Sequence, residues 1–450
     1  MSQAPSASET GYLRVLSRLD GTLLVIGSII GAGVFFTPHD IARVVQSPGT
    51  MLGVWVLGGL IALTGALSYA ELGGLFPRTG GVYVFLREAY GGLPAFLYGW
   101  AILLVIVPGA LAIVAGFFAT NLGRLAPGLA GAEIPVALSV IGLLTLVNVR
   151  GVRWGSTVQN VFTGAKLLAI LLLVAGGLAY RGERVAPAPD VVVPSPSHAG
   201  IAALLFAMMP VLFSYGGWQN GTYVAGEMRR PQRDVPWAVT VGTLVVIVAY
   251  LLVNLAYLRV LDPAAIAGDR GFASAAATAA LGPVGGVVVT LGILVSTFGI
   301  CAAMLLTNPR VAQALGADGL FFRRFGELHQ RFRTPHWAIV VLGAWSCALL
   351  LIGGAGQLLD SVVFVDWVFF AATGATVTIF RRRLPGAERP YRCPGYPWVP
   401  LLFTALAAGM AVLTLIKADA TSRLLGPGIL LAGVPAYLAF RASARAREGC

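Results

Sequence analysis

Three glycines interrupt the first long apolar stretch of this chain. Gly27, Gly31 and Gly33 fall within Val25-Ile-Gly-Ser-Ile-Ile-Gly-Ala-Gly-Val-Phe35, at the depth where a membrane-spanning helix is most regular. Glycine weakens a helix by about 1 kcal/mol relative to alanine, and a helix broken in lipid exposes backbone N–H and C=O groups that lipid cannot satisfy. The break therefore predicts a polar partner, and a bound solute is the candidate. The alternative is close helix packing, because Gly27 and Gly31 also form a small-xxx-small motif.

The composition indicates a polytopic membrane protein. Of the 450 residues, 57% are hydrophobic and only 11% are charged, whereas soluble domains carry roughly 25% charged residues. A spanning helix needs about 20 apolar residues, and about twelve such segments occur. We therefore predict an all-α fold with spans centred near Ile30, Leu63, Val107, Ile141, Leu171, Phe213, Ile247, Val295, Val341, Phe370, Ala408 and Leu431.

The distribution of charge predicts how the chain crosses the membrane. The net charge is +12, from 31 basic and 19 acidic residues. If the N-terminus is cytoplasmic, 22 of the basic residues fall in inner segments and 8 in outer ones, while Lys166 lies within a span. This asymmetry follows the positive-inside rule, so we expect a multi-pass protein of the cell membrane (inner or plasma membrane) with both termini cytoplasmic. The expected partner is then the lipid bilayer and not nucleic acid.

The sequence carries no signature of a metal site, a cofactor or catalysis. The cysteines, Cys301, Cys347, Cys393 and Cys450, fit neither a disulfide framework nor a metal-binding spacing. The phosphate-binding GxxxxGKS/T motif, HExxH and GxSxG are all absent from the sequence. We therefore expect no metal, no cofactor and no enzymatic activity.

A second interrupted span lies five spans after the first. The segment Phe213-Ser-Tyr-Gly-Gly-Trp-Gln-Asn-Gly221 holds three more glycines. Interrupted spans in corresponding positions of two five-helix units are typical of inverted-repeat transporters with a site at the membrane midplane. The predicted organisation, in chain order, is a cytoplasmic tail (1–18), a first repeat with helices 1–5 (19–180), an outer loop and a second repeat with helices 6–10 (181–381), helices 11 and 12 (382–441), and a cytoplasmic tail (442–450).

The ends of broken helices favour a zwitterionic ligand. A half-helix that starts near Ala32 directs free N–H groups, with roughly half a positive charge, back toward the break, where a carboxylate fits. Half-helices that end near Ile29 and Ser214 offer carbonyls that suit an ammonium group. Because Gly31 and Gly33 have no side chain, a ligand can approach the backbone closely. A carboxylate site beside an ammonium site describes the backbone of an α-amino acid.

Several motifs, in order and over nearly the whole chain, resemble one transporter family. They are Gly27-Ser-Ile-Ile-Gly-Ala-Gly-Val-Phe35, Ser68-Tyr-Ala-Glu-Leu-Gly-Gly-Leu-Phe-Pro-Arg-Thr-Gly-Gly-Val-Tyr83, the second break followed by Val224-Ala-Gly-Glu-Met228 and Pro231-Gln-Arg-Asp-Val-Pro236, then Asn308-Pro-Arg-Val311, Ala317-Asp-Gly-Leu-Phe321 and Pro394-Gly-Tyr-Pro-Trp398. The sequence resembles the amino acid–polyamine–organocation (APC) superfamily of permeases, in its L-type amino acid transporter (LAT) branch. The resemblance implies a leucine-transporter-type fold with discontinuous helices 1 and 6, a 5+5 inverted repeat and alternating access.

The resemblance also assigns substrate-binding residues on both broken helices. On helix 1 they are Ile29, Ile30, Gly31, Ala32 and Gly33, and on helix 6 they are Phe213, Ser214 and Gly216. Phe213 resembles the gating aromatic of the family; the alternative is an ordinary phenylalanine that faces lipid or core. Ala32 stands where many relatives have Ser or Thr, so we expect backbone N–H groups to hold the substrate carboxylate here.

Lys166 is the one basic residue predicted to lie deep in a span. It is ten residues beyond Ser156, roughly 15 Å into the membrane at 1.5 Å per residue, and an ionisable group at such a depth indicates function. Snorkelling is the alternative, although the side chain reaches only about 6 Å. In sodium-independent members of the resembled family, a helix 5 lysine occupies the place of sodium. We expect its ammonium to bridge a carbonyl near Gly27 and a hydroxyl of Ser296 or Thr297, unless these hydroxyls bind their own helix.

These features together predict a sodium-independent transporter of neutral L-amino acids, with exchange preferred. A titrating Lys166 would instead allow proton symport, because burial lowers the pKa of lysine. A polyamine or cationic amine permease is a third hypothesis, and it would need a carboxylate at the site, such as Asp366. Glu71 and Glu227, at predicted inner ends, are expected to pair with local arginines. Animal relatives of the family use the loop after helix 3 for a disulfide to an ancillary subunit; residues 121–133 contain no cysteine, so we expect no such partner.

Overall fold

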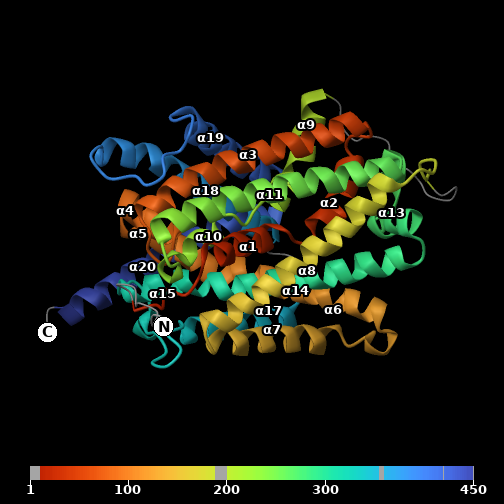
Figure 1. Ribbon diagram of the computed structural model, residues 1–450. Helices are drawn as coiled ribbons and strands as arrows, with labels where there is room; N and C mark the ends of the chain where they lie inside the picture. Colours follow the sequence, from red (N-terminus) through yellow and green to blue (C-terminus); the bar gives the residue numbers. More distant parts are fainter. Residues whose placement is uncertain (1–10, 188–199, 354–358, 419, 449–450) are drawn as a thin grey trace, which may run out of the picture.

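The computed structural model describes residues 11–187, 200–353, 359–418 and 420–448 and is helical through most of these ranges (Figure 1). Within the described ranges, β-structure is confined to two isolated bridges, Leu16 with Met228 and Val185 with Leu261. The helices of the first half are α1 (Arg18–Ile29), α2 (Gly33–Ala42), α3 (Pro48–Leu75), α4 (Val82–Tyr90), α5 (Gly92–Ala101), the π-helical η1 (Ile102–Ile106), α6 (Val107–Leu125), the 3₁₀ turn η2 (Pro127–Leu129), α7 (Glu133–Val149) and α8 (Val152–Ala179).

The second half continues with α9 (Gly200–Ser214), α10 (Asn220–Tyr223), the 3₁₀ turn η3 (Ala225–Glu227), α11 (Pro231–Val260), α12 (Pro263–Gly268), α13 (Phe272–Leu281), α14 (Val284–Thr307), α15 (Pro309–Ala317), α16 (Arg323–Gly326), α17 (His336–Ile352), α18 (Leu359–Arg383), α19 (Trp398–Lys417) and α20 (Ala420–Glu448). Among the described residues, nine helical stretches are long and apolar enough to cross a membrane. The shorter apolar helices α7, α9 and α17 fall at the remaining predicted spans. The expected all-α polytopic fold is confirmed, while the division into two inverted repeats stays a prediction.

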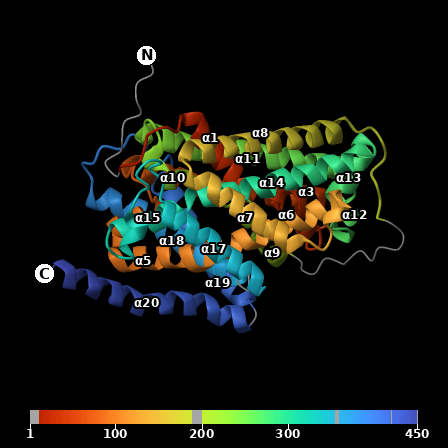
Figure 2. The same ribbon diagram turned by 90° about the horizontal axis from the view of Figure 1, so that it is seen from below.

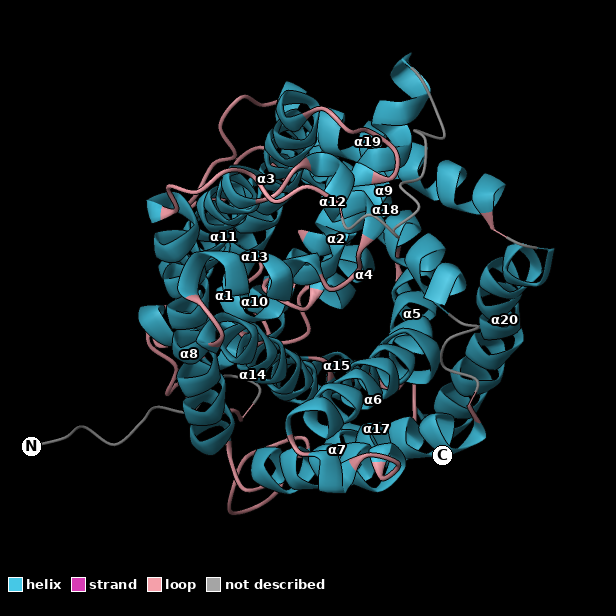
Figure 3. Ribbon diagram, turned by 90° about the vertical axis from the view of Figure 1, so that its right-hand side faces the viewer, coloured by secondary structure: helices cyan, strands magenta, loops and turns pink. Residues whose placement is uncertain are grey.

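The long helices run side by side and surround the broken ones. In Figure 1, α3, α11, α8 and α14 lie roughly parallel, and in the end-on view of Figure 3 the short helices α2 and α10 lie inside a ring to which these four contribute. The first half-helix, α1, packs against α8, α11 and α14. The last helix, α20, lies at the edge of the bundle against α5 (Figure 2). The breaks are therefore shielded from lipid by other helices.

Polar contacts fix the start of α1. Ser17 and Asp20 form a capping box, in which the Asp20 amide donates to Ser17 Oγ at 3.2 Å and the Ser17 amide donates to the Asp20 carboxylate at 2.7 Å. The Leu16 amide donates to the Glu227 carbonyl oxygen at 2.9 Å. The buried Glu227 carboxylate accepts two hydrogen bonds from Arg310, both 2.9 Å long. The segment before α1 is thus joined to η3, which follows α10, and η3 is joined to α15, which follows α14.

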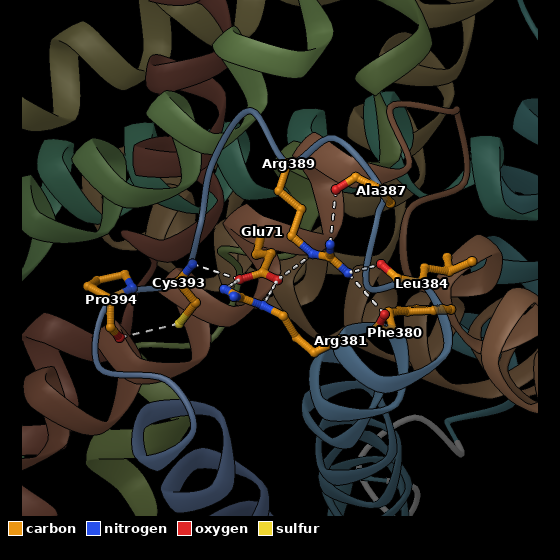
Figure 4. A network of polar contacts seen from close by, with 8 residues as sticks. All are labelled: Glu71, Phe380, Arg381, Leu384, Ala387, Arg389, Cys393 and Pro394. Carbon is orange, nitrogen blue, oxygen red and sulfur yellow. Dashed lines mark hydrogen bonds and ion pairs between the residues drawn. The ribbon is translucent and has the colours of Figure 1, made fainter.

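Glu71, near the end of α3, is a second buried acid with a full set of donors (Figure 4). Arg381 donates to both carboxylate oxygens at 2.7 Å, and the Cys393 amide donates to Oε2 at 2.7 Å. Arg389 adds an ion pair at 3.3 Å between its Nε and Oε1. Burial, and after it the Glu71 carboxylate, raises the pKa of the Cys393 thiol to about 12, so this thiol stays protonated near neutral pH. Glu71 and Glu227 pair with arginines, as expected, but the expectation of local partners is wrong, because Arg381, Arg389 and Arg310 are remote in sequence.

Replacement of Glu71 by glutamine is expected to destabilise the protein. The substitution leaves the partly buried guanidinium group of Arg381 and the buried one of Arg389 without a countercharge, and breaking a buried ion pair in this way costs roughly 3–5 kcal/mol. The measurement is thermal unfolding of purified Glu71→Gln in detergent. Glu88→Gln is the matched control, because the ion pairs of Glu88 with Arg78 and Arg87 are partly exposed and worth roughly 0–1 kcal/mol. Equal melting temperatures for the two variants would contradict the expectation.

Candidate substrate site

Two helix breaks meet at the centre of the bundle. Between α1 and α2 the chain leaves the helix at residues 30–32, and between α9 and α10 it does so at residues 215–219. Gly217 has a φ of +126°, and a Cβ on it would lie 2.5 Å from the carbonyl oxygen of Ser28. A Cβ on Gly33 would lie 2.6 Å from the Oγ of Ser214. Glycine is therefore required where the backbones of the two breaks touch, and both predicted interruptions are confirmed.

The ammonium of Lys166 binds the carbonyls at the first break. Its Nζ, on α8, donates to the carbonyl oxygen of Gly27 at 3.0 Å and to that of Ile30 at 2.8 Å. The Lys166 side chain is 1% exposed, so it does not snorkel to the surface. A Cβ on Gly299 of α14 would lie 3.2 Å from Nζ, so a glycine leaves room for the lysine. The predicted contact with Gly27 is present, and a second one with Ile30 accompanies it.

The two predicted hydroxyls of α14 differ in which carbonyls they bind. Ser296 Oγ donates to the Ile30 carbonyl oxygen at 3.2 Å, so Lys166 and Ser296 share one acceptor. Thr297 Oγ1 donates to the carbonyls of Ile293 and Leu294 within its own helix, at 2.8 and 3.1 Å. The expected bridge from the ammonium directly to a hydroxyl is therefore replaced by a shared carbonyl, and Thr297 takes the local alternative. The reason is helical rotation, because adjacent side chains point about 100° apart.

Gly27 also serves close packing. A Cβ on Gly27 would lie 2.2 Å from both Gln159 Nε2 and Thr163 Oγ1 of α8. Gln159, Thr163 and Lys166 share one face of α8 at spacings of four and three residues, and all three are buried. Close helix packing therefore explains the glycine at position 27, whereas the helix break lies after it, at residues 30–32.

Tyr250 is a site residue that the sequence reasoning missed. Its hydroxyl, on α11, lies 3.1 Å from the Ile29 carbonyl oxygen and 3.2 Å from the Ser214 carbonyl oxygen, and the side chain is fully buried. One hydroxyl thus serves the last carbonyls of both half-helices. The expectation that these carbonyls are free for a substrate ammonium is corrected accordingly: each already has a protein donor within reach, although a carbonyl oxygen retains a second lone pair.

The amides after the first break remain available. The Ile30 amide donates to the Ile26 carbonyl at 2.8 Å. Among the backbone hydrogen bonds of turns, loops and helix caps in the described residues, none has the amide of Ala32 or Gly33 as its donor. Ile29, Ile30 and Gly31 are buried, whereas Ala32, Gly33 and Gly216 retain accessible surface. The backbone that borders accessible space is thus the amide end of α2, which is the end that favours an anion.

The two α9 side chains assigned to the site differ in burial. Ser214 is buried, and its Oγ lies 2.7 Å from Thr37 Oγ1 of α2 and donates to the Pro210 carbonyl at 2.8 Å. Phe213 is 57% exposed and shares an apolar stripe of α9 with Leu205, which is 45% exposed. This position fits the alternative of a phenylalanine on an outer face, and its gating role stays a prediction.

Paired interrupted helices around a buried cation define a polytopic carrier of small solutes. The chain matches the amino acid permease family over residues 16–436. It is 32% identical to the serine/threonine exchanger SteT of Bacillus subtilis (strain 168), over 95% of this chain and 97% of the relative. It is 28% identical to the mouse b(0,+)-type amino acid transporter 1 (96% and 88% covered) and 29% identical to the human cystine/glutamate transporter (97% and 87%). The chain therefore belongs to the amino acid permease family of the APC superfamily, as the resemblance to the LAT branch implied.

Removal of the Tyr250 hydroxyl is expected to impair transport. In Tyr250→Phe the carbonyls of Ile29 and Ser214 lose their shared donor, and an unsatisfied buried carbonyl costs about 1–3 kcal/mol. We expect at least about a tenfold fall in uptake of labelled amino acid into proteoliposomes, since 1.4 kcal/mol is a factor of ten. Tyr257→Phe, on the same helix, is the control because that hydroxyl is buried without a hydrogen-bond partner. Wild-type uptake by Tyr250→Phe at equal reconstituted amount would refute the role.

Proposed function

We propose that this chain is a sodium-independent exchanger of neutral L-amino acids that works by alternating access. The observation that carries the proposal is the ammonium of Lys166 on the carbonyls of Gly27 and Ile30, with Ser296 on the second. Carbonyls of an unwound helix and a nearby hydroxyl are the ligands with which transporters of this architecture coordinate sodium. Because the Lys166 ammonium occupies this position, no sodium ion from solution is needed there.

The substrate backbone binds at the break in this proposal. The carboxylate accepts hydrogen bonds from the amides of Ala32 and Gly33, at the positive end of α2. Because Ala32 has no hydroxyl, recognition of the carboxylate depends on the backbone. The ammonium uses the remaining lone pairs of carbonyls at the ends of α1 and α9. Such recognition involves no substrate side chain and therefore admits a range of amino acids.

Exchange follows from the cost of an empty site. When the two half-helices of each broken span close without substrate, the amides of Ala32 and Gly33 lose water and gain no acceptor, at about 1–3 kcal/mol for each group. A bound carboxylate removes that cost, so the loaded carrier returns faster than the empty one. The expectation of no disulfide-linked partner stays a prediction; Cys301, Cys347 and Cys393 are free thiols in the described chain.

The central test is uptake of labelled amino acids by proteoliposomes. We expect unlabelled L-amino acid inside the vesicles to stimulate uptake severalfold, replacement of sodium by choline to leave uptake unchanged, and an imposed pH gradient to cause no accumulation. Accumulation in empty vesicles under an inward proton gradient would establish the symport alternative. Absence of both accumulation and stimulation for every amino acid would contradict amino acid transport.

Lys166→Ala tests the observation on which the proposal depends. Without the ammonium, the Gly27 carbonyl loses its side-chain donor and the Ile30 carbonyl retains only Ser296, and hydrogen bonds to a charged group contribute about 1.5–3 kcal/mol. We expect uptake to fall at least about tenfold, with partial rescue by sodium if the ion enters the vacated place. Lys417→Ala, which changes the other lysine of the chain at the end of α19, is expected to transport normally. Uptake equal to wild type in Lys166→Ala would sink the proposed role of the ammonium.

A further inference from the structure

The span formed by α5, η1 and α6 departs from α-helical geometry in its middle. In the π-helical η1, the Val107 amide donates to the Ile102 carbonyl, five residues back instead of four. Pro108 follows directly. Proline has no N–H to donate, and its ring clashes with the carbonyl four residues earlier in an α-helix, which here belongs to Leu104. Single π-helical turns inside α-helices are rare and occur frequently at functional sites.

The Leu104 carbonyl takes its hydrogen bond from another helix. The indole Nε1 of Trp345, on α17, donates to it at 2.7 Å. Trp345 is the tenth residue of α17, roughly 14 Å from its first residue at 1.5 Å per residue, and therefore lies in the middle of a predicted span. A tryptophan near the membrane surface directs its N–H to water or headgroups, which are absent at this depth. Trp345 thus supplies the donor that Pro108 lacks.

The two parts of this span contact different half-helices. Before η1, the hydroxyl of Tyr98 on α5 is hydrogen-bonded to that of Tyr223 on α10. After η1, Phe117 of α6 packs against Phe36 of α2, with ring centroids 5.0 Å apart. Since α2 and α10 lead away from the breaks toward opposite ends of the bundle, η1 lies between a contact to each end.

We propose that η1 is a hinge of this span and that Trp345 is a positioning residue for transport. Its indole holds the Leu104 carbonyl while α5 and α6 move relative to each other, each with the half-helix that it contacts. An unbroken α-helix would couple α2 and α10 rigidly, whereas a hinge of a few residues absorbs the change. This inference rests on the proposed alternating access, in which the two ends of the bundle open in turn.

The first test is Trp345→Phe in proteoliposomes loaded with unlabelled amino acid. The ring is kept but the donor to Leu104 is lost, and an unsatisfied buried carbonyl corresponds to a factor of about 5–150. We expect the maximal exchange rate to fall at least about fivefold, while the substrate KM stays within about twofold, because no site residue is changed. Trp337→Phe is the matched control, since Trp337 is on the same helix and contacts Arg324 through its ring face, which phenylalanine retains.

The second test is a double-mutant cycle with Pro108→Ala. Alanine restores an N–H at position 108, which can donate to the Leu104 carbonyl in an unbroken α-helix and so replaces the indole. In the Pro108→Ala background, Trp345→Phe is therefore expected to change neither the maximal rate nor the melting temperature by more than Trp337→Phe does. In the wild-type background it is expected to lower both. Pro108→Ala alone is expected to slow maximal exchange without raising KM, because the hinge is lost.

Several outcomes would overturn the inference. Wild-type maximal exchange by Trp345→Phe, or by Pro108→Ala, would exclude the hinge. An equal loss from Trp345→Phe in both backgrounds would leave the tryptophan a packing role only, and a rise in KM without a fall in maximal rate would assign it to substrate binding. If wild-type protein exchanged no amino acid, the proposed function would fail and the transport role with it. The melting temperatures of the cycle would still show whether Trp345 serves the Leu104 carbonyl, so the two failures are distinguishable.

Discussion

The structure depends on one requirement: the backbone groups exposed at two helix breaks need polar partners at a depth without water. Three of the helices that pack against α1 supply a donor each. From α8 the ammonium of Lys166 binds two carbonyls, from α11 the hydroxyl of Tyr250 lies between two more, and from α14 Ser296 shares one with the lysine. The surrounding helices thus hold the breaks by their carbonyl ends, and this makes an interruption in mid-membrane tolerable.

The amide ends of the broken helices therefore have fewer protein hydrogen-bond partners than the carbonyl ends. The described protein offers three donors to the carbonyls of the breaks but no backbone acceptor to the amides of Ala32 and Gly33. An incoming ligand is therefore required above all as an acceptor, which favours a carboxylate more strongly than an ammonium. The sequence-based expectation treated the two ends as equivalent, whereas in the described structure the amides of Ala32 and Gly33 lack the protein partners that the carbonyls have.

Sequence reasoning located those features that contradict an apolar span and missed those that do not. The glycines at both breaks and Lys166 are conspicuous among apolar residues, so the broken helices and the buried cation were predictable. Tyr250 was not, because tyrosine is an ordinary residue of an apolar helix and only the fold aims its hydroxyl. The choice between Ser296 and Thr297, and the direction in which Asp366 points, depend on the rotation of α14 and α18 about their axes. Rotation is set by packing against several helices at once, and one sequence does not reveal it.

The ionic contacts away from the site join the ends of several helices at one end of the bundle. Glu227, directly after the second half of helix 6, is bound to Arg310 beyond helix 8, and its carbonyl also holds Leu16 before α1. These contacts close the end of the bundle where both half-helices α1 and α10 leave the site. Ser214 and Thr37 join α9 to α2 beyond the breaks. In the proposed alternating access, opening at this end breaks the Glu227 contacts.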